Sequence, residues 1–380
     1  MTEQAKVPAI RFAGFTDPWE QRKLGELTES YSGGTPAAGE SEFYGGSIPF
    51  IRSAEIAAES TELFLTEKGY ESSSARMVKP GDVLYALYGA TSGEVAVSRQ
   101  KGAINQAILA ILPRDDCDAR YITAWLRKQK GYIVTTYLQG GQGNLSGVIV
   151  KNLEVSIPSL PEQQKIGFML SHLDSLITLH QRKYDKLVIL KKSMLEKMFP
   201  KDGESVPEIR FAGFTDPWEQ RKFSDIVNVC SGKDYKHLEE GPIPVYGTGG
   251  FMTSVDEALS YDRDAVGIGR KGTIDKPYLL KAPFWTVDTL FYAIPKSDMD
   301  LEFVHCSFLN VDWKSKDEST GLPSLSKEAI NETIALVPSF NEQSRLGDFF
   351  YNLDNLITLH QRKLELLQNI KKSLLDKMFV

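Results

Sequence analysis

The chain has 380 residues, of which 42% are hydrophobic and 25% are charged. These are the proportions of a globular protein with room for two domains, and no apolar run approaches the ~18 residues that a membrane span needs. The net charge is −6, with about +1 on residues 1–199 and about −7 on the remainder, so any nucleic-acid binding must come from local patches.

The N-terminus and the cysteines indicate a reducing compartment. The opening "MTEQAKVPAI" lacks the basic flank and apolar run of a secretory signal, and three scattered cysteines are too few for a disulfide framework. We therefore expect a cytoplasmic protein without a membrane partner.

The first recognisable segment is a repeat. "IRFAGFTDPWEQRK" stands at residues 10–23 and returns unchanged at 209–222, and we call the two copies the frame segments. Their aromatic residues are expected to be packing anchors, with contact to a partner protein as the alternative. These residues are Phe12, Phe15 and Trp19 in the first copy and Phe211, Phe214 and Trp218 in the second.

Each frame segment is followed by an insert of mixed α+β character. In the first insert, residues 82–89 and 107–113 read as strands, residues 119–129 as a helix, and residues 153–158 as a strand after a polar loop. In the second insert the corresponding stretches are 264–269, 289–295, 300–310 and 333–338. The inserts are not copies, since they share little beyond Ile48-Pro49 and Ile243-Pro244.

A second repeat, at 173–199 and 353–379, has the apolar periodicity of a long helix. Ser159-x-x-Glu162 and Ser339-x-x-Glu342 predict capping boxes at the two helix starts. At ~1.5 Å per residue each helix would run roughly 57 Å, and burying one apolar seam against the other, antiparallel, is the simplest solution. The predicted seam comprises Leu173, Ile177, His180, Leu187, Leu353, Ile357, His360 and Leu367. For the two histidines a polar seam position is favoured over a ligand or catalytic role.

The repeats follow one another in a circular order. Residues 200–208 connect the first long helix to the second frame segment. If the two chain ends were joined, the second long helix would be connected to the first frame segment in the same way. We therefore expect the ends to lie close together. The predicted segments are an insert with its frame at 1–160, a helix at 161–199, a linker at 200–208, a second insert with its frame at 209–340 and a helix at 341–380.

No catalytic or metal-binding pattern is found in the sequence. Histidines and cysteines form no zinc set. "GIGRKG" at 267–272 fits a dinucleotide-binding pattern, but Pro277 follows before a helix could form, so Arg270 and Lys271 are instead expected on a basic turn facing solvent or phosphate. The polar loops offer Gln142, Asn144, Ser146, Ser324 and Lys327 for base edges or phosphates, with ordinary turn chemistry as the alternative.

The chain resembles the specificity (S) subunit of type I restriction–modification systems. The resemblance is carried by the doubled "IRFAGFTDPWEQRKL", the landmarks "GGTP...IPFIRSAEI" and "PVYGTGGF", the paired "P-S-[LF]-x-E-Q" helix starts, and the recurring "LITLHQRK...KKS-x-L-x-KMF". In that family each insert is a target recognition domain and the helices form an antiparallel spacer.

The resemblance implies a host-defence protein that performs no reaction itself. It would bind double-stranded DNA at a bipartite target, one half-site for each recognition domain, and join two methyltransferase (M) subunits and further restriction (R) subunits. S-adenosylmethionine, ATP and magnesium would belong to those partners, and this chain would hold no cofactor or metal. Half-sites on one face lie ~34 to 36 Å apart, which helices of the expected length can span.

Further candidate contacts follow from the matching landmarks. Phosphate contacts are expected from Arg52, Arg76, Lys79, Arg99, Lys101, Lys233 and Lys271, and base contacts from residues such as Ser53 and Thr248. An ordinary solvated surface stays open for each lysine and arginine. Because the chain is acidic overall, we expect weak DNA binding by the chain alone.

Two other functions remain open. A self-contained methyltransferase or nuclease lacks its motifs in this sequence, and a coiled-coil scaffold without DNA would not explain a repeated frame around divergent inserts.

Overall fold

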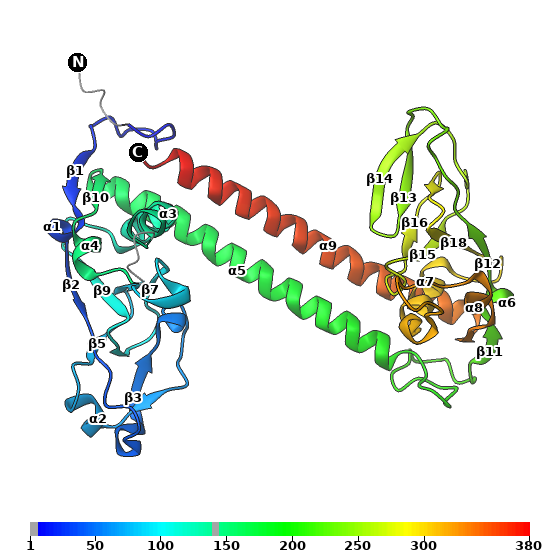
Figure 1. Ribbon diagram of the computed structural model, residues 1–380, viewed down its shortest axis with the longest axis horizontal. Helices are drawn as coiled ribbons and strands as arrows, with labels where there is room; N and C mark the ends of the chain where they lie inside the picture. Colours follow the sequence, from blue (N-terminus) through cyan, green and yellow to red (C-terminus); the bar gives the residue numbers. More distant parts are fainter. Residues whose placement is uncertain (1–6, 139–143) are drawn as a thin grey trace. The chain divides into compact units, whose positions relative to one another are not determined.

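The computed structural model describes residues 7–138 and 144–380. The chain forms two compact units (Figure 1). Unit 1 comprises Met1–His180 and Lys363–Val380, and unit 2 comprises Gln181–Arg362. Each unit therefore contains one part of each long helix, whereas the predicted boundaries set the helices apart as separate segments.

Unit 1 contains the first frame segment and the first insert. In chain order its elements are β1 (Glu20–Lys23), α1 (Leu24–Leu27), β2 (Thr28–Ser32), β3 (Tyr44–Ile51), β4 (Phe64–Leu65), α2 (Glu67–Glu71), β5 (Arg76–Val78), β6 (Val83–Ala86), β7 (Val95–Val97), β8 (Gly102–Ile104), β9 (Ile108–Pro113), α3 (Ala119–Leu138), α4 (Gly147–Lys151) and β10 (Glu154–Ile157). Two four-stranded sheets have the orders β2-β9-β6-β7 and β4-β3-β8-β5, and β1 pairs with β10.

Unit 2 has the second frame segment and the second insert. Its elements are β11 (Glu219–Lys222), α6 (Phe223–Ile226), β12 (Val227–Ser231), β13 (Ile243–Gly247), β14 (Gly250–Val255), β15 (Ala265–Gly269), β16 (Tyr278–Leu280), β17 (Trp285–Thr286), β18 (Leu290–Pro295), α7 (Leu301–Leu309), α8 (Lys327–Glu332) and β19 (Ile334–Val337). Its sheets have the orders β12-β18-β15-β16 and β14-β13-β17, and β11 pairs with β19.

The two inserts share most of their strand topology although they are not sequence copies, and only β5 of the first has no counterpart in the described sheets of the second. The order β12-β18-β15-β16 repeats β2-β9-β6-β7 strand for strand, and β13 pairs in parallel with β17 as β3 does with β8. The predicted α+β class and its strands at 82–89, 107–113, 264–269 and 289–295 are confirmed. The helices differ more, because α3 has 20 residues and α7 has nine.

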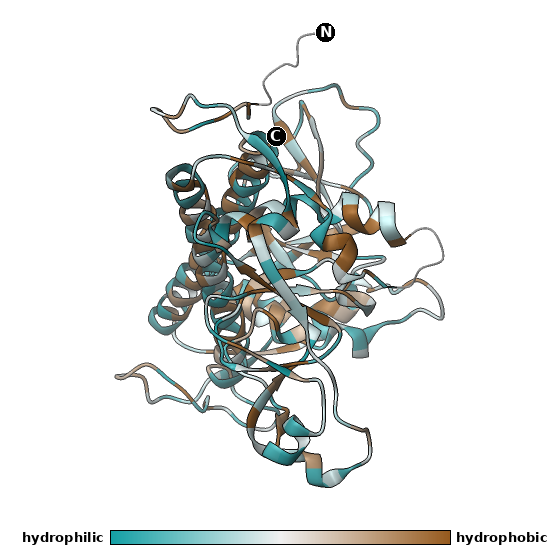
Figure 2. Cartoon of the chain, turned by 90° about the vertical axis from the view of Figure 1, so that its left-hand side faces the viewer, coloured by the Kyte–Doolittle hydropathy of each residue, from teal (hydrophilic) through white to brown (hydrophobic). Residues whose placement is uncertain are grey.

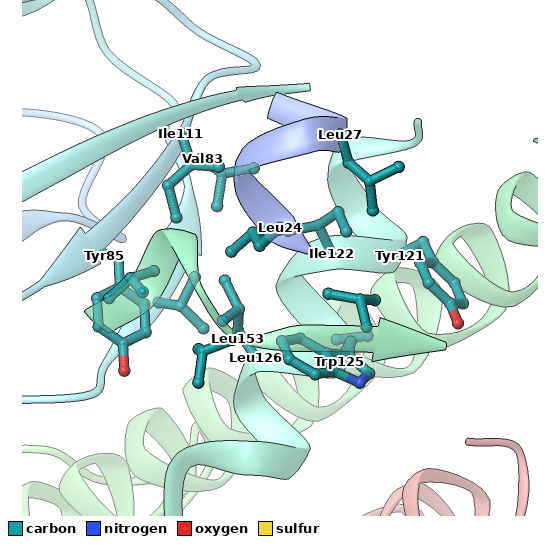
Figure 3. Packing of buried hydrophobic residues seen from close by; sticks show 14 of the residues in the cluster. Leu24, Leu27, Val83, Tyr85, Ile111, Tyr121, Ile122, Trp125, Leu126 and Leu153 are labelled. Atoms are coloured by element: carbon teal, nitrogen blue, oxygen red, sulfur yellow. The ribbon is translucent and has the colours of Figure 1, made fainter. Parts of the chain in front are cut away.

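The core of unit 1 explains why its strands read as continuous apolar runs. Side chains alternate between the two faces of a strand, so in β6 Val83 and Tyr85 join one hydrophobic cluster while Leu84 and Ala86 join another. Figure 3 shows the first cluster, in which Val83, Tyr85 and Ile111 meet Leu24, Leu27, Tyr121, Ile122, Trp125, Leu126 and Leu153. Both faces of this sheet are therefore covered, as a near-continuous apolar run predicts.

The two long helices are α5 (Leu160–Lys197) and α9 (Phe340–Lys377), of 38 residues each. Apolar and polar residues are interspersed along both of them (Figure 2). In unit 1, Lys371 Nζ lies 2.5 Å from Asp174 Oδ1, and in unit 2, Lys191 Nζ lies 2.6 Å from Asp354 Oδ1. Since the later residue of α5 pairs with the earlier residue of α9, the helices run antiparallel, as predicted.

The starts of both helices correct a sequence prediction. Glu162 and Glu342 were expected to cap their own helices, but each carboxylate receives two hydrogen bonds from an arginine of a frame segment. Arg11 donates to Glu162 at 2.7 and 2.8 Å, and Arg210 donates to Glu342 at the same distances. Both carboxylates are fully buried, at 0% and 2% side-chain exposure.

The neighbouring glutamines fasten the helices to the inserts. Gln163 Oε1 accepts the backbone N–H of Asp118 at the start of α3, and Gln343 Oε1 accepts that of Asp300 at the start of α7. The repeated Glu-Gln pair therefore ties frame, helix and insert together in each unit.

The circular order of the repeats is confirmed by one repeated backbone contact. Ile10 donates its backbone N–H to the carbonyl of Lys377 at 2.9 Å, and Ile209 donates to Lys197 at 2.8 Å. The first contact joins parts of the chain near its two ends, and the second spans only the linker. The ends of the described chain therefore meet as expected.

The frame aromatics lie against these same junctions. Trp19 is buried with its ring 6.1 Å from that of Tyr121, and Trp218 is buried beside Phe199 and Phe303. Phe12, Phe15, Phe211 and Phe214 are half-buried.

The predicted seam residues are mostly half-buried. Leu353 is buried in the unit 2 core, Leu187 packs against that core, and Leu173 packs against the core of unit 1. Ile177, His180, Ile357, His360 and Leu367 are half-buried.

Candidate nucleic-acid interface

In unit 2, a turn and a loop far apart in sequence meet at one end of the β15 sheet. The turn is Arg270–Gly272, directly after β15, and Lys271 forms a β-bridge with Ser324. Leu325 donates its N–H to the carbonyl of Arg270 at 2.9 Å, and Gly272 donates to that of Pro323 at 2.8 Å. The predicted basic turn and the predicted polar loop thus form a single surface.

The loop is ordered by one carboxylate. Asp317 Oδ1 accepts the backbone N–H groups of Ser319 and Ser324, each at 2.9 Å, and the hydroxyl of Ser319 at 2.8 Å. These hydrogen bonds favour the ionised form and lower the pKa of Asp317. The loop that presents Ser324 is therefore held in one conformation by its own side chains.

Two more predicted residues lie at this end of the sheet. Lys233 follows β12, and its N–H donates to the carbonyl of Thr286 at 2.9 Å. Thr248 follows β13, and its Oγ1 would lie 3.9 Å from a methyl group added at Gly272. We call Lys233, Thr248, Arg270, Lys271 and Ser324 the unit 2 polar end.

The cations of the unit 2 polar end are not neutralised by carboxylates of the described chain. Arg270 is exposed and contacts the carbonyl of Asp288 and the ring of Phe291. Within residues 7–138 and 144–380, no carboxylate forms an ion pair with Arg270, Lys271 or Lys233. Their charges are therefore available to an anion from outside.

Lys327 and Ser326 lie next to this surface. Ser326 accepts the N–H of Ala329 and caps α8, and Lys327 is the exposed first residue of that helix.

Unit 1 repeats the arrangement with different side chains. Tyr88 forms a β-bridge with Asn144, and Leu145 donates its N–H to the carbonyl of Leu87 at 3.0 Å. Tyr88 and Asn144 therefore correspond to Lys271 and Ser324. Ser146 caps α4, as Ser326 caps α8, and the predicted Gln142 lies outside the described residues.

The predicted basic residues of unit 1 are not gathered at that end. Arg76 pairs with Ile104 at one end of β5, and its guanidinium lies 4.1 Å from the centre of the Tyr31 ring. Lys79 directly follows β5 and Lys101 directly precedes β8, so both lysines lie at the opposite end of this strand pair. Arg99 forms an exposed ion pair with Glu59 at 3.3 Å. These residues therefore do not form one patch.

Arg52 and Ser53 correspond to Gly247 and Thr248, since β3 and β13 have matching parallel partners. Here, however, the chain turns into a short 3-10 helix, Ser53–Glu55, and Arg52 donates hydrogen bonds to the carboxylate of Glu55. The side-chain hydrogen bond from Arg52 is the largest cause that lowers the pKa of Glu55 to about 2. Arg52 is thus engaged inside the unit.

We expect Arg52→Ala to raise the pKa of Glu55 toward the ordinary 4.5. Because the folded pKa is depressed, ionised Glu55 stabilises the wild-type fold above pH ~4.5, and this contribution disappears only as pH falls through about 2. NMR titration of the Glu55 carboxyl carbon measures the shift. Arg76→Ala, whose guanidinium contacts Tyr31, is the control and should leave the Glu55 titration unchanged; an unshifted pKa in Arg52→Ala would contradict the assignment.

Sequence reasoning missed polar residues at the unit 1 end because it searched for cations. Thr35 donates its hydroxyl to Gln106 Oε1 at 2.7 Å, and both residues are exposed. They follow Gly33 and Asn105, which hydrogen-bond at the end of the sheet beside Tyr88. The Ser-Gly pair that ends β2 and β12 alike was the signal that could have located them.

The described residues provide no sign of a metal site or a membrane span. No group of three or more metal-ligating side chains comes together in residues 7–138 and 144–380. In that same part of the chain, no helix has both the length and the apolar content to cross a bilayer. The G-x-G-x-x-G pattern leads from β15 into β16 and not into a helix, so the dinucleotide alternative is excluded there.

Two units of one topology, each ending in a surface of turn and loop residues and each built on the same pair of helices, define a protein with two related but unlike binding modules. The family model for the type I restriction modification DNA specificity domain matches residues 16–188 and again residues 215–369. The chain belongs to this family, and its function is that of a specificity subunit of a type I restriction–modification system.

Similar proteins extend over almost the whole chain. The MjaVIII and MjaIX type I specificity subunits of Methanocaldococcus jannaschii are 22% and 25% identical to it, and each match covers 95% of this chain and 92% of the relative. The crystal structure of a type I S subunit from M. genitalium superimposes with a TM-score of 0.74 over 98% of this chain and 99% of that one, at 19% identity. That likeness supports the shared fold.

Proposed function

We propose that the chain recognises a bipartite DNA target, with each unit reading one half-site through its turn-and-loop end, and that it directs adenine methylation or restriction by partner subunits. The observation that carries the proposal is the repeated surface: Lys271 with Ser324 in unit 2 and Tyr88 with Asn144 in unit 1 occupy the same place in the same fold. Unlike side chains at equivalent positions are what two unlike half-sites require.

The side chains at the turn-and-loop end of each unit indicate which contacts with DNA that unit would make. In unit 2, Lys233, Arg270 and Lys271 would hold phosphates and fix the register, while Thr248 and Ser324 would reach base edges. In unit 1 the corresponding turn and loop carry uncharged side chains, with Tyr88, Asn144, Thr35 and Gln106 as donors and acceptors. Unit 1 would therefore depend more on hydrogen bonds and less on charge.

The chain would be the non-catalytic member of its complex. The frame segments and exposed helix surfaces would bind two M subunits, which would supply S-adenosylmethionine chemistry, and R subunits would add ATP- and magnesium-dependent restriction. The alternative of a self-contained methyltransferase requires the isolated chain to bind S-adenosylmethionine, which calorimetry would detect, and that of a self-contained nuclease requires it to cleave DNA without partner subunits.

The test exchanges one insert within the chain's own frame. Leu24 donates its N–H to Leu153 and Phe223 donates to Thr333 at 2.9 Å each, so residues 24–153 can replace residues 223–333 at matched junctions. We expect the modified target to become an inverted repeat of the half-site read by unit 1. Genome-wide mapping of modified adenines in cells that carry the variant with its M subunits measures the outcome.

A single result would count against the proposal. If the variant still assembles with its M subunits and the mapped target keeps its original two unlike halves, the inserts do not determine the sequence. The unaltered chain, mapped in the same cells, supplies the control target.

A further inference from the structure

The β13–β14 hairpin of unit 2 (Figure 1) carries two adjacent apolar residues whose side chains are exposed. Phe251 is 63% exposed and Met252 is 52% exposed. The pairing register shifts here, because Tyr246 faces Phe251 while the preceding Val245 faces Thr253, which leaves Met252 as an extra, bulged residue. A bulge interrupts the alternation of side chains and redirects them, so consecutive apolar residues can both be displayed.

The tip is held rigidly from behind. The Tyr246 ring lies 6.3 Å from that of Phe251 in an edge-to-face arrangement, and Tyr278 of the neighbouring sheet donates its hydroxyl to the carbonyl of Gly247 at 2.6 Å. A methyl group at Gly247 would come within 2.6 Å of Met252 Sδ, so the thioether is packed close to the hairpin backbone. The exposed pair is therefore positioned before any partner binds.

The surroundings of the tip indicate an anionic partner. Thr248 at the hairpin turn lies beside Gly272, so the turn that carries the exposed Arg270 and Lys271 is next to the turn of the hairpin. An apolar contact bordered by unpaired cations is complementary to duplex DNA, whose major groove admits a two-stranded β-ribbon between two rows of phosphates. In that groove the one apolar group on a base edge is the 5-methyl group of thymine.

We propose that the β13–β14 hairpin enters the major groove of the half-site read by unit 2 and that Phe251 and Met252 contact thymine 5-methyl groups. The inference rests on the proposed function and adds the chemical feature that this unit discriminates. Arg270 and Lys271, on the neighbouring turn, hold phosphates beside the hairpin. Unit 1 has the Ser53–Glu55 helix where unit 2 has this hairpin, so the contact belongs to unit 2 alone.

The test removes single methyl groups from the DNA. The chain is assembled with its M subunits, and its dissociation constant is measured on the mapped target and on duplexes in which each thymine of the unit 2 half-site is replaced by uracil. Because the proposed modified base is adenine, every half-site contains at least one thymine. We expect one or more replacements to weaken binding about fourfold, the factor that one buried methyl group supplies.

Protein variants then assign the effect to the hairpin. Phe251→Ala and Met252→Ala should weaken binding to the thymine duplex and should no longer distinguish it from the uracil duplex. Tyr261→Ala is the matched control, because Tyr261 is 64% exposed and lies in the segment before β15, at the other end of that strand from the turn. That variant should retain the full thymine preference, and uracil in the unit 1 half-site should affect all variants equally.

The inference is overturned if no uracil replacement weakens binding, or if Phe251→Ala and Met252→Ala both retain the wild-type ratio between thymine and uracil duplexes. These outcomes differ from a failure of the proposed function. If the insert exchange moves the modified half-site but the hairpin variants behave as wild type, unit 2 reads DNA by other residues. If the exchange moves nothing, both proposals fail.

Discussion

Replacing Arg210 by methionine is expected to destabilise unit 2 by about 3–5 kcal/mol, the range for breaking one partner of a buried ion pair. Arg210 and Glu342 are joined by two hydrogen bonds and have side-chain exposures of 12% and 2%. Methionine fills much of the same space but leaves the carboxylate buried without a cation. Hydrogen exchange of peptides from α9 and β19, with chemical denaturation, measures the loss in unit 2 separately from unit 1.

The controls distinguish a lost ion pair from a lost side chain. The double variant Arg210→Met with Glu342→Met should recover most of the stability, since an apolar pair removes the unpaired charge. Arg345→Met, at an exposed position one turn further along α9, should change stability by less than about 0.5 kcal/mol. A double variant as unstable as Arg210→Met would show that the charge is not the cause. Arg11→Met should affect unit 1 in the same way through Glu162.

These ion pairs give the frame segments a physical role that the sequence alone did not specify. The repeat and its periodicity were enough to predict two long antiparallel helices, because a doubled apolar seam is a strong signal. The capping box was wrong because a local pattern cannot reveal a distant partner: Glu162 and Arg11 are 151 residues apart in the chain. Only the fold brings an arginine of the frame to the helix start.

The shared topology of the inserts was only partly predictable. Buried strands such as β6 and β15 are recognisable because both faces are covered and the runs are apolar throughout. Short strands such as β4 and β17, of two residues each, carry no usable pattern. The repeated frame segments were recognisable from sequence, whereas the strand-for-strand correspondence required backbone pairing.

At the candidate interface, too, single residues were predictable from the local sequence, whereas the contacts between distant segments were not. Lys271 and Ser324 were each predicted from their own turns, but their meeting depends on a bridge across more than fifty residues. In unit 1 the emphasis on cations selected Arg52 and Arg99, which the fold pairs with Glu55 and Glu59. Charge in a sequence does not reveal whether a carboxylate will neutralise it in the fold.

Gly33→Ala is expected to destabilise unit 1 by about 3 kcal/mol or more, because an added methyl group would lie 1.7 Å from the carbonyl oxygen of Ile104. The methyl carbon is fixed by the backbone of residue 33, and the oxygen belongs to the backbone of Ile104, so neither atom can rotate away. The two sheets of the insert would have to separate. The same substitution at Gly131, in α3 with no atom within 4 Å, should stabilise the unit by about 0.5–1 kcal/mol. Denaturation monitored by hydrogen exchange in unit 1 should therefore show that Gly33→Ala lowers the free energy of unfolding and that Gly131→Ala raises it.

The second unit supplies an independent check of this cause. Gly232 stands at the end of β12 as Gly33 stands after β2, and a methyl group there would lie 2.0 Å from the carbonyl oxygen of Val287. Gly232→Ala should therefore destabilise unit 2 to a similar extent, and a neutral result at either glycine would contradict the close approach of the sheets. In both units this close approach of the two sheets lies near the turn and loop of the candidate interface. The shared fold therefore requires glycine at both positions, whichever bases the surrounding side chains read.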